Sequence, residues 1–392
     1  MNPRRTFDGG RCVARRSLVV VVGLVLGTSL AVAADPAPKP KQVGPDPKLY
    51  QATVDRAIKF LALQQGEDGA ISPRIGIGPT AMATLGLLRA GRTTADPQVA
   101  KGLKYIEEYT QETGGIHMPG GRIPVYETCI AMMCLKEANR DGRYNKILAA
   151  ADAFIRKNQV DETKGKDKSD ITYGGVGYGG RSRPDLSNTA FLLDALKSAG
   201  AKADDPAMQK ALVFVSRCQN LESEHNTTKY ASKYNDGGFY YTCAGEQRNR
   251  GGEGGSQQET IAGLRSYASM TYSGLKSMIY AGLTKDDPRV KAAIGWIQKN
   301  YGLKNNPGLG DAGLFYYYHT FAKALDAMGV DELEDAKGVK HDWRREMTEE
   351  LARRQRPDGS WVNTNPQWME GDPNLATAFS LLALTYCRPT ER

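Results

Sequence analysis

One pattern occurs six times along this 392-residue chain, and it restricts the fold more than any other feature of the sequence. Each copy contains a helix-like segment, a glycine-containing turn and a second helix-like segment rich in Ala and Leu. Units of this kind cannot bury their apolar faces alone, so they must stack on one another. The first segments are residues 54–64, 99–109, 147–158, 208–219, 290–299 and 343–355.

Two residue types recur at matching places in the copies. A glutamine stands at or just beyond the end of each first segment, and one threonine aligns near the start of each second segment. A hydroxyl at the start of a helix can bond backbone groups, so we interpret the threonines as structural residues. The glutamines are Gln64, Gln111, Gln159, Gln219, Gln298 and Gln355, and the threonines are Thr80, Thr128, Thr189, Thr271, Thr320 and Thr377.

The two segments of each copy differ in polarity. Charged residues such as Arg56, Lys59 and Lys101 occupy one face of the first segments, which predicts outer helices. Apolar residues surround the second segments, which predicts helices buried on every side. We therefore expect an all-α fold, a closed α6/α6 toroid of two concentric rings with an axial cavity where the inner helices begin. A ring also suits a chain longer than the ~250–300 residues at which a single compact core stops growing.

Residues 1–33 have the composition of a signal peptide. Five arginines precede an apolar run over residues 18–33, which ends in the small-residue sequence Ala31-Val32-Ala33. The run is short of the ~20 residues that a spanning helix needs, so a retained anchor is the less favoured interpretation. We expect export to the periplasm, cell envelope or extracellular space, by the general or the twin-arginine route. No membrane span would then remain, although contact with a membrane surface stays open.

The rest of the chain divides into a linker and one large domain. Residues 34–48 are rich in Pro and Lys and predict an extended linker, whereas residues 49–388 form the expected toroid, with glycine-rich inserts at 160–184 and 220–263. The net charge of +8 does not indicate a nucleic-acid partner, because half of it belongs to residues 1–33.

The cysteines give no sign of a disulfide framework or a metal site. Those outside the signal segment form an odd and scattered set, and the chain has neither a CxxC nor an HExxH motif. We expect no metal and no cofactor. The five cysteines are Cys129, Cys134, Cys218, Cys243 and Cys387.

Residues 355–361 resemble a motif of a known family. They read Gln-Arg-Pro-Asp-Gly-Ser-Trp, similar to the glutamine–tryptophan motif of squalene-hopene cyclases, and residues 65–71 are a degenerate copy. We expect Gln355 to bond the turn backbone and Trp361 to cover the neighbouring helix end. With the six repeats, residues 51–388 resemble the α/α-toroid superfamily of terpenoid cyclases and protein prenyltransferases. One fold serves many functions, so this resemblance implies a fold more strongly than an activity.

The catalytic residues of these families are only partly present. Squalene-hopene cyclases carry an Asp-x-Asp-Asp-Thr stretch, which residues 185–189 match as Asp-Leu-Ser-Asn-Thr. Ser187 stands where the proton donor of the family stands, and a hydroxyl is a far weaker acid than a carboxylic acid. Tyr318-His319-Thr320 resembles the histidine stretch of zinc prenyltransferases, but residues 265–270 lack the Asp and Cys ligands. These departures speak against both known chemistries. Whether the protein is an enzyme stays open, and the resemblance implies a terpenoid cyclase-like type (isomerase or lyase) if it is one.

Candidate site residues gather at the expected cavity mouth. The candidate acid–base groups are Asp185, Glu127 and His319. The candidate ligand-binding residues are Asn188, Tyr178, Tyr267, Tyr316 and Tyr318, with Tyr126 and Tyr317 nearby. Aromatic rings suit an apolar chain, a sugar face or a cation. Each candidate also has a structural interpretation: Asp185 as a helix cap, His319 as a core histidine, and the tyrosines as packing between helices.

Three functions remain open at this point. The first is a ligand-binding or enzymatic toroid with its site in the axial cavity, for an isoprenoid-like or polymeric ligand. The second is a non-catalytic cell-envelope scaffold that makes its contacts through the toroid rim. The third, a carbohydrate-active enzyme, needs two carboxylates ~5–10 Å apart, for which only Glu127 and Asp185 are candidates. A deep cavity with inward-pointing acid–base groups would favour the first function, and a ring plugged by aromatic side chains would favour the second.

Overall fold

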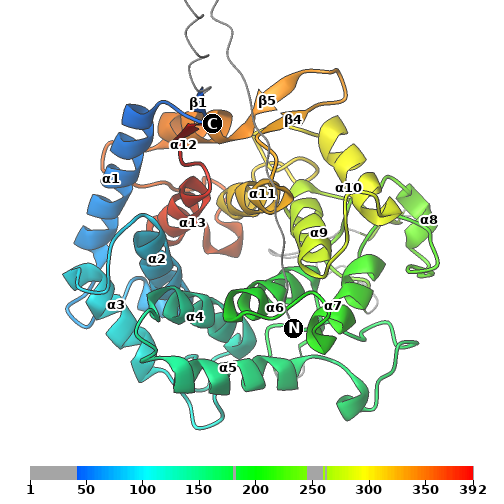
Figure 1. Ribbon diagram of the computed structural model, residues 1–392, viewed down its shortest axis with the longest axis horizontal. Helices are drawn as coiled ribbons and strands as arrows, with labels where there is room; N and C mark the ends of the chain where they lie inside the picture. The colour runs from blue at the N-terminus through cyan, green and yellow to red at the C-terminus, as the bar shows by residue number, and fades with distance from the viewer. Residues whose placement is uncertain (1–41, 180–181, 245–258, 261–262, 392) are drawn as a thin grey trace, which may run out of the picture. The chain divides into compact units, whose positions relative to one another are not determined.

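Two concentric rings of helices make up the protein in the computed structural model, which describes residues 42–179, 182–244, 259–260 and 263–391 (Figure 1). The outer ring contains α1 (Pro47–Gln64), α3 (Pro97–Glu108), α5 (Asn145–Asn158), α7 (Pro206–Arg217), α10 (Pro288–Lys299) and α12 (Trp343–Arg354). The inner ring contains α2 (Gly78–Arg89), α4 (Pro124–Ala138), α6 (Leu186–Ala199), α9 (Ala268–Tyr280), α11 (Leu314–Met328) and α13 (Pro373–Thr385). The expected signal peptide, residues 1–33, lies outside the described residues.

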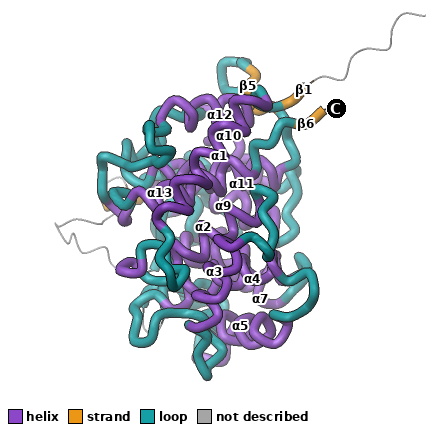
Figure 2. The backbone as a smooth tube through the Cα atoms, turned by 90° about the vertical axis from the view of Figure 1, so that its left-hand side faces the viewer, coloured by secondary structure: helices purple, strands orange, loops and turns teal. Residues whose placement is uncertain are grey.

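The inner ring closes on itself. Each inner helix packs against the next one, and α13 packs against α2. The outer helices α12 and α1 are also in contact, which joins the last unit to the first. Strands β1 (Gln42–Val43) and β6 (Thr390–Glu391) pair antiparallel at the edge of the toroid (Figure 2). The predicted α6/α6 toroid is confirmed.

Five of the six helix hairpins share one turn geometry. The turn glycine has a left-handed φ of 82–91°, and a Cβ atom there would lie 1.8–2.6 Å from a carbonyl oxygen of the neighbouring outer helix. Two residues later, a backbone N–H donates to the aligned threonine hydroxyl over 2.8–3.1 Å. The structural interpretation of these threonines is thus confirmed. The glycines are Gly69, Gly114, Gly174, Gly237 and Gly359, and the threonines are Thr80, Thr128, Thr189, Thr271 and Thr377.

Glutamine side chains join neighbouring hairpins in four of the units. In each case Nε2 donates to the carbonyl of the turn glycine and to a carbonyl of the neighbouring outer helix. The glutamines are Gln65, Gln159, Gln219 and Gln355. Gln65 rather than Gln64 does this in the first unit, whereas Gln111 bonds only its own turn. The Gln355 bond to the Gly359 turn carbonyl is the one that the motif predicted, and its bond to Thr53 links α12 to α1. Trp361 is buried, with Nε1 donating to the Leu351 carbonyl in the last turn of α12.

The fifth hairpin, α10–α11, departs from this geometry. Thr320 donates to the Tyr317 carbonyl within its own helix instead of receiving a turn N–H. The N-cap of α11 is Gly313, whose backbone is left-handed with a φ of 64°. Gln298 makes no side-chain hydrogen bond within the described residues, so its expected equivalence to the other glutamines is wrong. This irregular unit contains Tyr316, in the first turn of the inner helix α11.

The loops contain short elements that the repeat pattern does not predict. They are α8 (Ala231–Tyr234), the β2–β3 pair (Glu259–Thr260, Gly263–Leu264), the β4–β5 hairpin (Glu332–Glu334, Lys340–Asp342) and the 3-10 turns Pro73–Ile75, Glu162–Lys164 and Gln367–Met369. Helix α1 begins at Pro47, earlier than the expected 54–64 segment and within the predicted linker. Within the described ranges, no helix has the length and apolar character needed to cross a bilayer.

Candidate functional site

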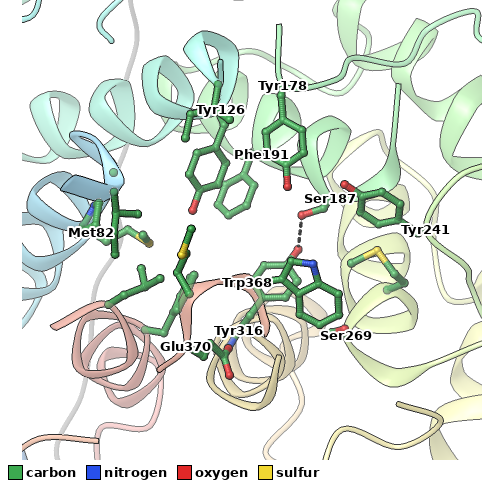
Figure 3. A pocket seen from close by; sticks show the side chains of 18 of the residues that line it. Met82, Tyr126, Tyr178, Ser187, Phe191, Tyr241, Ser269, Tyr316, Trp368 and Glu370 are labelled. Carbon is green, nitrogen blue, oxygen red and sulfur yellow. Dashed lines mark hydrogen bonds between the residues drawn. The ribbon is translucent and has the colours of Figure 1, made fainter. Parts of the chain in front are cut away.

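A cavity of about 330 Å³ opens where the inner helices begin (Figure 3). All six inner helices supply lining residues, and most of these come from the first turn or two of each helix. The aromatic lining residues are Tyr126, Tyr178, Phe191, Tyr241, Tyr267, Tyr316, Trp368 and Phe379. The cavity therefore lies where the repeat pattern predicted it.

The structure separates the candidate tyrosines into two groups. Tyr178, Tyr267 and Tyr316 line the cavity, together with Tyr126. Tyr318 does not, because it faces the outer ring and its hydroxyl donates to the Leu303 carbonyl over 2.5 Å. The expectation that Tyr318 binds ligand is corrected accordingly, since its hydroxyl is already committed to the backbone.

Glu127 is buried and holds two loops together. Its Oε1 accepts from the Ile77 N–H at 2.8 Å, and its Oε2 accepts from the Met118 N–H at 3.0 Å. Burial raises the pKa of the Glu127 carboxyl, and these two amide bonds partly offset that rise. Glu127 does not line the cavity. Its geometry is that of a structural clamp, not of an acid facing a ligand.

Asp185 caps α6 and lies behind the cavity wall. Its Oδ1 accepts from the Asn188 N–H at 2.8 Å, and its Oδ2 accepts from the Asn188 side-chain amide at 2.7 Å. Burial raises the pKa of Asp185 to about 6, although the bonds from Asn188 and Tyr241 oppose this rise. Neither Asp185 nor Asn188 lines the cavity, whereas Tyr241 does. Both candidates thus act on the cavity only through the side chains in front of them.

His319 lies below the cavity floor. It is one turn beyond Tyr316 on α11, and its ring lies beside Phe379 and Tyr386. Burial and the nearby Lys323 ammonium lower the pKa of His319 well below its ordinary value, so the imidazole is neutral. It is buried, its Nδ1 has no hydrogen-bond partner, and it does not line the cavity. The structure therefore does not bring His319 together with Asp185 or Glu127 in one acid–base site.

A buried ionic layer blocks the axis beneath this floor. Asp194 of α6 bonds Lys276 of α9 at 2.5 Å and Lys323 of α11 at 2.8 Å. Lys323 also reaches Met133 of α4 on the opposite side of the ring, at 3.9 Å from its sulfur. These residues lie at least one helical turn deeper than the lining residues of the same helices. Together they define the ionic layer, which the sequence patterns did not predict.

Four hydroxyl-bearing residues on one wall form what we call the hydroxyl corner: Ser187, Tyr178, Tyr241 and Tyr316. Ser187 Oγ lies 2.9 Å from the Tyr316 hydroxyl, and the Tyr178 and Tyr241 hydroxyls point toward Ser187 (Figure 3). Burial raises the pKa of each of the three phenols, so they are neutral. Tyr241 and Ser187 were not among the expected ligand-binding residues; the position of Ser187 in the Asp-Leu-Ser-Asn-Thr stretch was its signal.

Glu370 and Trp368 come from the loop after α12 and were also missed. The Glu370 carboxylate accepts from the Phe315 and Tyr316 N–H groups at 3.2 and 2.7 Å, which caps α11 from a distant part of the chain. Burial raises the pKa of Glu370. Trp368 and Met369 both adopt left-handed backbone and remain 37% and 59% exposed. Non-glycine residues in this conformation are strained and concentrate at functional sites.

The lining offers little for acid–base or metal chemistry. Glu370 is the one carboxylate among the described lining residues, and its oxygens are already bonded to backbone amides and to Asn363. No Lys, Arg or His occurs among those lining residues. The described ranges contain no group of three His, Cys, Asp or Glu side chains able to hold a metal ion. The cavity is thus aromatic and nearly uncharged, with its polarity concentrated in hydroxyl groups.

Comparisons with known proteins agree with this architecture. Residues 78–244 match the family model of the squalene-hopene cyclase C-terminal domain, less than half of the chain. No curated protein matches the sequence.

Solved structures extend the likeness to the whole toroid. One is the type II terpene cyclase MstE from Scytonema, at 12% identity over 87% of this chain and 98% of that one, with a TM-score of 0.51. Another is an alpha-amylase from Clostridium perfringens, at 12% identity over 85% and 97%, also with a TM-score of 0.51. A third is a family 76 glycoside hydrolase from a bovine Bacteroides thetaiotaomicron strain, at 10% identity over 85% and 78%, with a TM-score of 0.50. At such identities these structures show a shared α/α-toroid fold, common to terpene cyclases and glycosidases.

Proposed function

We propose that this α/α toroid is an exported protein that binds a small isoprenoid-like ligand, or one end of a longer one, in the cavity at the start of its inner helices. The observation that carries the proposal is the cavity itself, which is blind, aromatic and nearly uncharged. Ligand sites are typically concave and mostly apolar, with a few convergent polar groups, and span roughly 300–1,000 Å³. At about 330 Å³ this cavity is at the small end of that range.

The two enzymatic chemistries of the structural neighbours have no matching residues here. Cyclisation started by protonation needs a strong acid facing the ligand, and Ser187 occupies that position. Glycoside hydrolysis needs two carboxylates on either side of the reacting bond. Both candidates for that pair, Glu127 and Asp185, are bonded to backbone amides outside the cavity. The proposal is therefore ligand binding without catalysis by either route.

The proposal is tested by recovering the ligand from its native source. Protein purified from the cell envelope of its host would be extracted with solvent, and the extract analysed by mass spectrometry. We expect an isoprenoid at about one molecule per chain. Repeated extraction without such a compound, together with no change in Trp368 fluorescence when isoprenoids are added, would remove the proposal. Trp368 suits this readout because it is the one tryptophan of the cavity lining in the described residues.

The alternative of a cell-envelope scaffold rests on a different observation. Trp368 and Met369 are exposed apolar side chains at the cavity mouth, and exposed apolar residues can mark a contact surface. A scaffold would purify with a protein bound to this rim and with an empty cavity. The same purification therefore separates the two functions.

Export belongs to this proposal because residues 1–33 resemble a cleavable signal. Edman sequencing of protein recovered from its host tests it. We expect the mature chain to begin at Ala34; recovery of the intact N-terminus from the cytosol would contradict export.

A further inference from the structure

The polar groups of the cavity are not spread evenly over its walls. Ser187, Tyr178, Tyr241 and Tyr316 place their hydroxyls together on one wall, whereas Met82 and Tyr126 lie apart from this group (Figure 3). A ligand that fills the cavity therefore meets a concentration of hydroxyl groups at this corner, and a mostly apolar lining elsewhere with the separate hydroxyls of Tyr126, Tyr267 and Ser269. Such an arrangement fixes the orientation of an amphiphilic ligand.

The hydroxyl corner offers a hydrogen-bond acceptor. Each phenol oxygen of the corner carries lone pairs, and the Tyr178 and Tyr241 hydroxyls point toward Ser187 (Figure 3). Both residues line the cavity, so their oxygens can accept a hydrogen bond from a ligand.

The same corner offers a hydrogen-bond donor. Ser187 and Tyr316 have two O–H groups between them, and the 2.9 Å contact between their oxygens uses one proton. The remaining proton is available to a ligand, because the other contact of this pair, from Tyr316 to Ser273, is longer at 3.4 Å. The corner therefore combines an acceptor and a donor within one small polar patch.

A ligand hydroxyl complements this pair, because an alcohol can donate and accept at the same oxygen. A diphosphate would bring charge into a cavity whose described lining has no cationic side chain, and buried charge without a partner is costly. A hydrocarbon would leave the hydroxyl corner without ligand partners.

We propose that the hydroxyl corner binds the hydroxyl head group of an apolar alcohol, so that the ligand is a neutral isoprenoid-type alcohol and not a diphosphate or a hydrocarbon. This inference rests on the proposed function and specifies its ligand class.

The test compares three probes of equal chain length by isothermal titration calorimetry: geraniol, myrcene and geranyl diphosphate. We expect geraniol to bind about 5- to 10-fold more tightly than myrcene, which is the change in dissociation constant that one added hydrogen bond produces. Geranyl diphosphate should bind at least tenfold more weakly than geraniol. Equal affinities for geraniol and myrcene, or tighter binding of the diphosphate, would overturn the inference.

Variants test whether the preference for geraniol over myrcene comes from the hydroxyl corner. Ser187→Ala and Tyr316→Phe should each bring the geraniol-to-myrcene ratio close to one while myrcene affinity stays within about twofold. Tyr318→Phe is the matched control, since it removes a buried phenol hydroxyl from the same helix outside the cavity and should leave the ratio unchanged. An unchanged ratio in both corner variants contradicts the inference. Myrcene binding without any alcohol preference leaves the proposed function standing, whereas no binding of any probe to the unmodified protein removes both.

Discussion

Two carboxylates that looked like catalytic candidates in the sequence hold backbone amides in the structure. Glu127 bonds two loop N–H groups and Asp185 caps α6. Glu370, which was not a candidate, likewise caps α11 from a distant loop. A buried carboxylate is costly unless hydrogen bonds satisfy it, and the starts of helices and tight loops supply such donors. An acidic residue near the start of an inner helix can therefore have a structural or a catalytic role. The sequence does not distinguish the two roles, because they depend on whether backbone N–H groups or a ligand face the carboxylate.

Removing the Glu127 carboxylate should destabilise the fold without changing ligand affinity. Glu127→Ala leaves the Ile77 and Met118 amides without acceptors, which we expect to lower the free energy of unfolding by about 2–4 kcal/mol. Glu349→Ala, at an exposed position, serves as control and should cost less than about 0.5 kcal/mol. Urea unfolding measures both. A Glu127→Ala protein of unchanged stability would contradict the clamp.

Asp185 should make stability depend on pH in the acidic range. Its folded pKa of about 6 lies above the ordinary value of 3.8, so the folded state holds the proton more tightly. Its contribution to stability is therefore present below about pH 4 and is lost as the pH rises through about 6, on the order of 2–3 kcal/mol. Urea unfolding between pH 4 and 7 should show the unmodified protein losing stability relative to Asp185→Asn over this window. Parallel curves for the two proteins would show that Asp185 has an ordinary pKa.

At the scale of elements, the repeat pattern predicted most of the architecture. It predicted twelve ring helices, the inner and outer assignment and the cavity position, because apolar periodicity and turn glycines report packing directly. The helix starts were less accurate, although a usable signal was present. Five ring helices follow an Asp-Pro pair whose aspartate caps the first turn, at Asp46, Asp96, Asp205, Asp287 and Asp372.

The cavity could be predicted only in part, because it lies where the repeat is broken. The α10–α11 hairpin lacks the threonine and glutamine bonds of the other units, and Glu370 caps α11 in their place. That contact spans more than fifty residues of chain, so no local pattern reveals it. Such departures from local regularity are expected at functional sites.

The glutamine bridges are predicted to stabilise the ring at the four hairpin junctions that have them. Gln219 donates to the carbonyls of Gly237 and Arg289, both at buried positions of the junction between α7 and α10. Gln219→Ala removes both bonds and leaves the Gly237 carbonyl without this donor, which should cost about 1–3 kcal/mol. Gln298→Ala changes the equivalent residue of the irregular unit and should cost less than about 0.5 kcal/mol. Thermal and urea unfolding measure the stability of both variants. Equal losses of unfolding free energy would show that the bridging bonds of Gln219 do not stabilise the junction.

At the scale of the whole molecule, the ionic layer fills the axis of the inner ring below the cavity, so that the cavity does not continue through the toroid. Asp194, Lys276 and Lys323 join three neighbouring inner helices, and Lys323 reaches Met133 on the far side of the axis. Two ammonium groups thus share one carboxylate in the core. Burial raises the pKa of Asp194, but the two lysines outweigh burial and bring it below its ordinary value. For Lys276, burial is the largest effect and lowers its pKa to about 8.

This charge imbalance predicts opposite effects for two substitutions in the ionic layer. Asp194→Asn leaves two buried ammonium groups without a carboxylate and should lower the free energy of unfolding by about 3–5 kcal/mol. Lys276→Met leaves one matched pair, Asp194 with Lys323, and should be neutral or stabilising.

The pH dependence of stability tests the same imbalance independently. Because the folded pKa of Lys276 lies below 10.5, the unfolded state binds the extra proton, so stability should rise between about pH 8 and 10 in the unmodified protein. Lys276→Met should show a smaller rise, because Lys323, whose pKa burial also lowers, remains in the ionic layer. Urea unfolding compares the two variants. If Lys276→Met loses as much unfolding free energy as Asp194→Asn, both ion pairs stabilise the fold equally, and the ionic layer has no excess of buried positive charge.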